Sequence, residues 1–192
     1  MEKTKLGLAL CGSYCTYDKA FMAAEELCRA FDVVPIMSET ASATDSRFGR
    51  AEDHIKHLEE LTGKKVVKTI ADVEPLAPAG KMDVLLILSC TGNTMSKMSL
   101  GITDSAVLMA AKGMLRNGKP VVIGFSTNDG LSGSAPAIAA LLNKKNIYFV
   151  PFNQDDPVKK PFSLASDFEL AADAVDCALK GRQLQPIFAK QP

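Results

Sequence analysis

Hydroxyl and amide side chains crowd one short segment of the chain, residues 90–97, with the sequence CTGNTMSK. This segment directly follows the most apolar run, MDVLLILS at residues 82–89, which predicts a buried strand. A turn needs only one or two such polar residues, whereas a phosphate or a flat polar ring is held by several donors on one loop. Thr91, Gly92, Asn93 and Thr94 are therefore candidate binding residues.

Strand and helix patterns alternate along the chain and must position this segment. Short apolar runs predict strands over residues 6–11, 33–37, 65–68, 83–89, 121–125 and 147–150. Apolar residues spaced three and four apart predict helices over residues 17–31, 46–62, 94–116 (one helix or two), 136–145 and 164–180. Strands that are apolar throughout are typical of a parallel sheet covered by helices on both faces. The sequence therefore predicts an α/β fold, a single-domain three-layer α/β/α sandwich over residues 1–192 with a mainly parallel, doubly wound sheet of the Rossmann or flavodoxin type.

Polar residues also follow the other strands, at the points where those strands end. Ligands of doubly wound sheets bind beyond the carboxyl ends of the strands. The further candidate binding residues are Gly12 and Ser13 after the first strand, Ser38 and Thr40 after the second, and Ser126, Thr127 and Asn128 after the fifth. Each loop alone also fits an ordinary turn, and NDG at residues 128–130 is a common turn sequence. Together the loops indicate a site for a phosphorylated ligand with a polar ring.

The glycine pattern narrows the kind of ligand. The loop GSYCT at residues 12–16 contains neither the G-x-G-x-x-G pattern of dinucleotide sites nor the G-K-[ST] ending of a Walker loop. A nicotinamide dinucleotide on this loop is therefore disfavoured. A mononucleotide phosphate stays open, and so does a plain strand-to-helix turn.

Composition argues against several other classes of partner. The chain has 192 residues, 22 Lys and Arg against 22 Asp and Glu, and a formal net charge of zero. Because no basic stripe is interleaved with aromatic residues, nucleic acid is not expected as a partner. The apolar run at residues 6–11 is too short to span a membrane and lacks a signal cleavage site, so no membrane association is expected and a cytoplasmic protein is predicted.

The cysteines and histidines predict no metal site. None of the five cysteines forms a C-x-x-C pair. Cys11, Cys15 and Cys90 lie near strand ends, where packing is the commoner role and a redox thiol the rarer one. His54 and His57 share a predicted helix face with several charged residues, which predicts solvated side chains.

A longer pattern surrounds the opening segment. LILSCTGNTMSKMSLGITDSAVLMAAKGMLRNGKPVVIGFSTND, at residues 86–129, resembles the signature of flavoproteins similar to the flavin mononucleotide (FMN)-dependent cysteine decarboxylases. In that family a strand runs into Pro-Ala-(Ser/Thr)-Ala-Asn-Thr, then Ala-Lys, then Gly-Ile-Ala-Asp-Asn. The positions that keep this pattern are Thr91, Asn93, Thr94, Lys97, Gly101, Ile102 and Asp104. Ser89 and Gly92 stand where the family has its proline and its second alanine.

This resemblance implies FMN as the cofactor. It places the FMN phosphate and ring among three loops, at Gly12 and Ser13, at Ser38 and Thr40, and at Thr91, Asn93 and Thr94. The decarboxylases carry a histidine shortly before the fourth strand, whereas this chain has EPLAP at residues 74–78. Their acid–base chemistry is therefore not expected here.

A closer resemblance covers nearly the whole chain. The segments GSYCTY, LTGKK, TGNTMSK, VLMAAKGMLRNGKPVV, STNDGL and NKKNIYFVPFNQDDPVKKP look like those of the dipicolinate synthase B-subunit family. This resemblance implies a subunit that acts with an A subunit to oxidise dihydrodipicolinate to dipicolinate, in the mother-cell cytoplasm of a sporulating bacterium. It assigns NAD(P) to the A subunit and implies a homo-oligomer, a trimer or a multiple of one. A non-catalytic stabilising subunit and a phosphorylated-ligand or flavin-binding module are the alternatives.

Arg47 and Lys97 are the candidate catalytic residues, as cations that grip the carboxylates of such a substrate. Arg47 follows the second polar loop and offers a fork of donors. Lys97 follows the opening segment by one helical turn. Each is also explained by an ordinary position on a helix surface.

Overall fold

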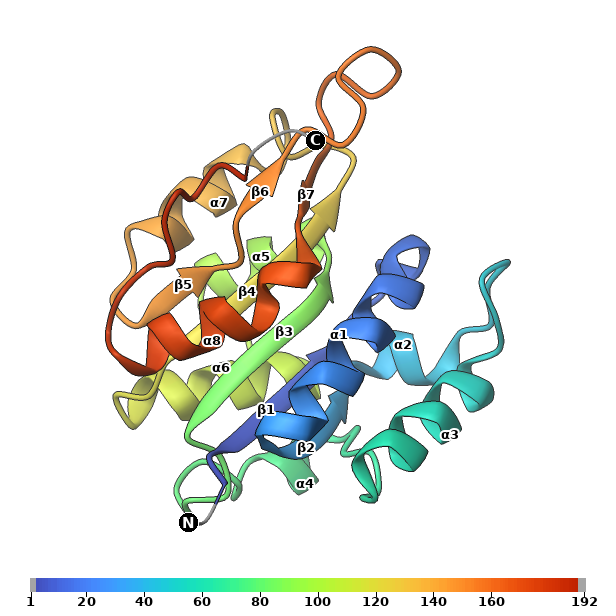
Figure 1. Ribbon diagram of the computed structural model, residues 1–192, viewed down its shortest axis with the longest axis vertical. Helices are drawn as coiled ribbons and strands as arrows, with labels where there is room; N and C mark the ends of the chain where they lie inside the picture. The colour runs from blue at the N-terminus through green and yellow to red at the C-terminus, as the bar shows by residue number, and fades with distance from the viewer. Residues whose placement is uncertain (1–2, 190–192) are drawn as a thin grey trace.

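Seven strands form one mixed sheet through the centre of this computed structural model, which describes residues 3–189 (Figure 1). The strands are β1 (Lys5–Leu10), β2 (Asp32–Met37), β3 (Val84–Cys90), β4 (Val121–Thr127), β5 (Ile147–Phe149), β6 (Phe152–Asn153) and β7 (Leu164–Ser166). Every residue of β3 is buried, as its unbroken apolar run predicts. The predicted α/β fold is confirmed.

The strand order places a topological switch point beside the opening segment. The order is β2-β1-β3-β4-β7-β6, and β5 pairs with the first half of β4. Strands β1 to β5 are parallel, whereas β7 pairs antiparallel with the last residues of β4. The chain runs from β1 to β2 on one side and later to β3 on the other side. Ligand sites of such sheets lie at the carboxyl ends of the strands flanking this point.

Helices cover both faces of the sheet and enclose two apolar cores. The helices are α1 (Tyr17–Ala30), α2 (Glu39–Ala43), α3 (Ala51–Thr62), α4 (Ile70–Val73), α5 (Gly92–Ser99), α6 (Ala106–Arg116), α7 (Ala135–Leu142) and α8 (Ala171–Leu179), with 3₁₀ turns η1 (Tyr14–Thr16) and η2 (Phe168–Leu170). Helices α1, α3 and α8 pack on one face, and α4 to α7 on the other (Figure 1). The predicted helix over residues 94–116 is two helices, because Gly101 turns the chain with a φ of +76°.

The predicted strand over residues 65–68 is wrong. Only a single bridge joins Val67 to Ile36, and a short helix, α4, follows at once. Lysines flank the two valines, and charged residues of this kind commonly limit pairing at a sheet edge. The Thr69 hydroxyl then accepts a hydrogen bond from the Asp72 N–H at 3.1 Å and starts α4.

The predicted helix over residues 164–180 begins too early. Its first residues form β7, where Ser166 Oγ accepts a hydrogen bond from the Phe125 N–H at 3.1 Å and donates to the Val150 carbonyl at 3.2 Å. The helical turn begins only after Asp167, whose carboxylate accepts from the Glu169 N–H at 3.2 Å. The short strands β6 and β7 were not predicted, since two or three residues carry no readable period.

The expectation of a solvated histidine face is wrong for His54. Its side chain is only 9% exposed, because α1 packs over α3 and brings the Tyr17 and Phe21 rings to 4.7 and 5.8 Å from the imidazole centroid. Its Nε2 has no hydrogen-bond partner among the described residues. Burial lowers the pKa of His54 from its usual value of 6.5 and outweighs the nearby carboxylate of Asp53, which raises it.

This lowered pKa gives a pH-dependent stability. Below about pH 6.5, His54 binds a proton in the unfolded chain but binds it more weakly in the folded chain. Protonation therefore favours the unfolded chain, and the free energy of unfolding falls as the pH drops. We expect His54→Phe, which keeps a flat apolar ring among the aromatics, to reduce this loss between about pH 7 and pH 5. Urea unfolding at several pH values measures it, and equal slopes in both proteins would contradict the account.

Candidate functional site

A cavity of about 310 Å³ lies at the carboxyl ends of β1, β2 and β3. Its lining residues are Gly12, Ser38, Glu39, Thr40, Thr91, Asn93, Thr94, Lys97, Asp104, Ser105 and Leu108. Three of the four predicted loops thus meet here, together with the first turn of α6. The switch point of the sheet explains why loops distant in sequence come together.

A sharp turn delivers the opening segment to the cavity. Ser89 is fully buried and has a φ of +50°, an uncommon value for a residue with a side chain. The pairing of β3 with β4 shifts register between Ile87 and Cys90 at the same place. Thr91 then caps α5, since its Oγ1 accepts from the Thr94 N–H at 3.1 Å.

Two more helices start at hydroxyl caps beside the cavity. Ser38 Oγ accepts from the Ala41 N–H at 3.2 Å, and Ser105 Oγ accepts from the Leu108 N–H at 3.2 Å. A capping hydroxyl that accepts one bond still has its own hydrogen to donate. These caps therefore offer neutral hydrogen-bond donors along the cavity wall.

Asn93 and Thr40 carry the uncommitted polar groups of the lining. The Asn93 side chain is exposed, and neither its amide nor the Thr40 hydroxyl has a hydrogen-bond partner among residues 3–189. An amide both donates and accepts, which suits the alternating donors and acceptors of a polar ring. These two side chains can bind a ligand without breaking an existing contact.

The charges of the lining are mostly paired within the protein. Lys97 Nζ lies 2.6 Å from Asp104 Oδ2. Glu39 Oε1 accepts a hydrogen bond from the Ala106 N–H at 3.0 Å, at the N-terminus of α6. Two carboxylates therefore stand against one ammonium, and an anion in the cavity would depend on neutral donors and the N-terminus of α5.

Ser13 lies beside the cavity and supports its walls. Its Oγ donates to the Ser126 carbonyl at 3.0 Å, and its N–H donates to the Ser89 carbonyl at 3.2 Å. Tyr14 Oη donates to the Thr40 carbonyl at 3.0 Å and ties the first loop to the second. The structure thus gives Ser13 and Ser126 contacts that hold the loops together.

The fourth predicted loop packs behind α5. Thr127 Oγ1 and Ser134 Oγ both donate to Asp129 Oδ1, the latter at 2.7 Å, and these hydroxyls lower the pKa of the Asp129 carboxyl. A Cβ built on Gly92 would lie 2.2 Å from Ser134 Oγ, so Gly92 contacts this cluster closely. Thr127, Gly92 and the exposed Asn128 are therefore not among the residues that line the cavity.

Arg47 lies outside the cavity lining. It is exposed on the loop between α2 and α3, with its guanidinium 4.8 Å from the Phe48 ring centroid. This is the geometry of a cation–π contact. Of the two candidate catalytic cations, the structure brings only Lys97 to the site.

The cysteines beneath the site are buried. Cys11 and Cys90 are both fully inaccessible, and a hydrogen bond from Cys11 together with burial raises the pKa of the Cys90 thiol. A raised pKa keeps the thiol protonated and unreactive. Packing is therefore the role that the structure supports for Cys90.

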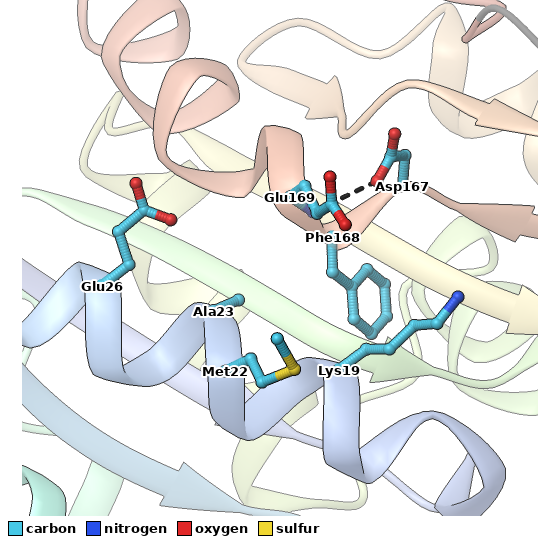
Figure 2. Close-up of a pocket in the computed structure, with 7 residues that line it drawn as sticks. All are labelled: Lys19, Met22, Ala23, Glu26, Asp167, Phe168 and Glu169. Carbon is cyan, nitrogen blue, oxygen red and sulfur yellow. Dashed lines mark hydrogen bonds between the residues drawn. The ribbon is translucent and has the colours of Figure 1, made fainter. Parts of the chain in front are cut away.

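A second hollow, of about 300 Å³, lies between α1 and η2 (Figure 2). Glu26, Asp167 and Glu169 present carboxylates around it, against the single ammonium of Lys19, and Phe168 lies between them. It shares no lining residue with the cavity at the strand ends. Its acidic rim would repel a phosphate, so it is not the site that the loops predict.

Two further properties follow from the described residues. No group of three or more His, Cys, Asp or Glu side chains in residues 3–189 could hold a metal ion. Within the same residues, no helix combines the length and the apolar character needed to cross a membrane.

Known proteins are similar to this chain in sequence over most of its length. A model of the Flavoprotein family matches residues 1–154. The B subunit of dipicolinate synthase from Bacillus subtilis (strain 168) is 42% identical over 191 residues, which cover 99% of this chain and 96% of that protein. The chain belongs to the flavoprotein family, in its group of dipicolinate synthase B subunits. The family predicted from the motifs is confirmed.

Solved structures also resemble this chain. The crystal structure of the B subunit of dipicolinate synthase from Bacillus halodurans C matches with a TM-score of 0.90 and 38% identity, covering 100% of both chains. The FMN-dependent cysteine decarboxylase SpaF matches with a TM-score of 0.65 and 18% identity, covering 93% of this chain and 97% of that one. The second similarity shows a shared fold.

Four lining residues of this flavoprotein were not predicted as site residues from the sequence. Glu39 lies within the second polar loop, Asp104 and Ser105 directly precede α6, and Leu108 lies in its first turn. A serine that caps an apolar helix was a readable signal for Ser105. No sequence signal indicated Glu39, because the Ala106 N–H that donates a hydrogen bond to it is 67 residues away in the chain.

Proposed function

We propose that this chain is the B subunit of a dipicolinate synthase and acts with an A subunit to oxidise dihydrodipicolinate to dipicolinate, pyridine-2,6-dicarboxylate, during bacterial sporulation. The observation that carries the proposal is the 42% identity to the B subunit of a dipicolinate synthase along 99% of this chain. The cavity at the switch point is the place we propose for the chemistry. We place the protein in the mother-cell cytoplasm.

The proposed cofactor is FMN, which supplies a hydride acceptor when bound. Asn93 and Thr40 would contact its polar ring, because their side chains have no other partner among the described residues. The hydroxyls of Ser38 and Thr91 and the first N–H groups of α5 would hold its phosphate. Gly12 leaves the wall open, since the nearest atoms to a Cβ built there are 3.9 Å away.

The polar and charged groups that line the cavity fit the flavin ring of FMN better than they fit its phosphate. With Glu39 and Asp104 against Lys97, the lining carries no surplus of positive charge for a dianion. We therefore expect FMN to bind reversibly. Lys97 is the cation we propose to orient a substrate carboxylate, in exchange for its ion pair with Asp104.

The partner completes the reaction in this proposal. Aromatising the ring releases a proton and removes a hydride, whose acceptor would be either FMN on this chain or NAD(P), which we assign to the A subunit. No histidine stands at residues 74–78, so we transfer none of the decarboxylases' acid–base chemistry. We also propose a homo-oligomer, a trimer or a multiple of one.

A non-catalytic stabilising subunit, or a module that binds a flavin or another phosphorylated ligand, is the second candidate. The observation that favours it is that Lys97 is paired with Asp104 and that Arg47 is not among the lining residues, so the lining of the cavity holds no unpaired cation. Such a subunit would raise the stability of the A subunit without affecting turnover through its own residues.

Turnover of dihydrodipicolinate by the two purified subunits, mixed and separate, tests the proposal. We expect turnover only in the mixture, and we expect Lys97→Met to lower it at least about tenfold, the effect of losing one charge-assisted contact. Lys68→Met, at an exposed lysine outside the cavity lining, is the matched control. Full turnover with Lys97→Met would favour the non-catalytic role.

A further inference from the structure

A groove of about 350 Å³ lies on the α5–α7 layer of the molecule, next to the candidate site. Its apolar lining comes from Met98, Ile102, Leu108 and Leu115. Leu108 also lines the cavity at the strand ends, so the two hollows adjoin across the first turn of α6. We call this hollow the basic groove, because its charged lining residues are Lys112, Arg116 and Lys144.

Charge in the basic groove is entirely of one sign. No Asp or Glu is among its lining residues, although the chain as a whole has no net charge. Lys112 and Arg116 are exposed, lie one turn apart on the same face of α6, and have no ion-pair or hydrogen-bond partner for their charged groups within residues 3–189. Positive charge gathered without a counter-ion attracts an anion.

Lys144 shapes one wall of the basic groove. Its Nζ donates to the carbonyls of Met98 and Ser99, at 3.3 and 3.4 Å, in the last turn of α5. The turn between α7 and β5 is thereby held against the connection from α5 to α6. The wall is therefore formed by contacts within this chain.

We propose that the basic groove binds a small planar carboxylate, with its ring on the apolar floor and its carboxylates on Lys112 and Arg116. The volume suits a small molecule, and sites of this kind combine an apolar lining with a few polar groups. Arginine and lysine bind carboxylates through charge-assisted hydrogen bonds. The acidic hollow of Figure 2, with a similar volume, has the opposite charge and serves as an internal comparison.

The identity of the natural ligand, a pyridine dicarboxylate, is inferred from the proposed function and rests on it. A pyridine dicarboxylate has the flat body and the anionic groups that the basic groove fits. Because the groove adjoins the cavity at Leu108, a dicarboxylate held there lies beside the proposed reaction site. That the ligand is a small planar carboxylate is inferred from the lining residues of the basic groove alone.

Calorimetric titration of the whole chain with pyridine-2,6-dicarboxylate in metal-free buffer tests the inference. We expect saturable binding that Lys112→Ala combined with Arg116→Ala weakens at least tenfold, about the effect of losing one strong charged contact. Alanine keeps the helix intact at both positions. The matched control is Lys68→Ala with Arg182→Ala, which removes the same charges at exposed positions elsewhere and should leave the affinity unchanged.

Three further measurements separate the outcomes. Benzene-1,3-dicarboxylate should bind comparably, and pentanedioate, which lacks a ring, should bind more weakly. FMN affinity should be equal in the groove variant and the wild type, so loss of flavin binding and loss of groove binding are distinguishable failures. Absence of binding at millimolar ligand, binding unchanged in the groove variant, or self-association that the groove variant abolishes would each overturn the proposal.

Discussion

Replacing Ser89 with proline is expected to lower the free energy of unfolding by roughly 3 kcal/mol or more. The proline ring fixes φ near −65°, whereas Ser89 has a φ of +50° at the end of β3. The residue is fully buried, and its hydroxyl and carbonyl accept hydrogen bonds from Thr16 Oγ1 and the Ser13 N–H at 2.9 and 3.2 Å. Moving this backbone would disturb two of the loops that form the site. Urea unfolding monitored by circular dichroism measures the loss.

Ser89→Gly is the control for this substitution. Glycine adopts a positive φ without steric cost, so this variant should lose only the contribution of the hydroxyl contact to the free energy of unfolding, about 1 kcal/mol. The related decarboxylase motif has proline at this position, so the result also tests whether the strand-to-helix turn differs between the two groups. A proline variant as stable as the wild type would show that the turn at Ser89 is described wrongly.

Replacing Gly92 with alanine is expected to cost about 1–3 kcal/mol, the usual effect of overpacking a tight contact. The added methyl group would lie 2.2 Å from Ser134 Oγ and 2.9 Å from Thr127 Oγ1. Ser134 is only 3% exposed and donates to Asp129, so it cannot move aside without losing that hydrogen bond. Thermal unfolding measures the effect, and a weaker affinity for FMN should accompany it because α5 is displaced.

Gly12→Ala is the matched control, because a Cβ there meets its nearest atoms at 3.9 Å, an ordinary contact distance. We expect its unfolding free energy to be that of the wild type. In the Gly92→Ala background, Ser134→Gly should recover part of the lost stability by removing the clashing side chain. If Gly92→Ala were as stable as the wild type, the close contact between Gly92 and the hydroxyls of Ser134 and Thr127 would be wrong.

The regular part of the fold could be predicted from the sequence because its signals are local. The apolar run of β3 and the spacing of apolar residues in α1 depend on neighbours along the chain. Gly63 and Gly118 end their helices with φ values of +66° and +69°, as glycines after helical patterns indicate. The loops of the site were found for the same reason, since each directly follows a strand.

Long-range contacts account for what the sequence did not predict. Strand β7 forms because Ser166 reaches the backbone of β4, 41 residues earlier. His54 is buried by aromatic residues of α1, on another helix. Lys97 and Arg47 were chosen by residue type, and only the fold separates them, because Lys97 lies on α5 at the cavity and Arg47 lies on the exposed loop between α2 and α3.

Titration of the purified chain with FMN, followed by flavin fluorescence and the visible spectrum, tests the central claim most directly. We predict saturable binding, and we expect Asn93→Ala to weaken it about tenfold, the loss expected for one good polar contact. The control is Asn143→Ala, at an exposed asparagine outside the cavity lining, which should leave the affinity unchanged. No saturable binding, either alone or with the A subunit, would contradict a flavin site at the carboxyl edge of this sheet.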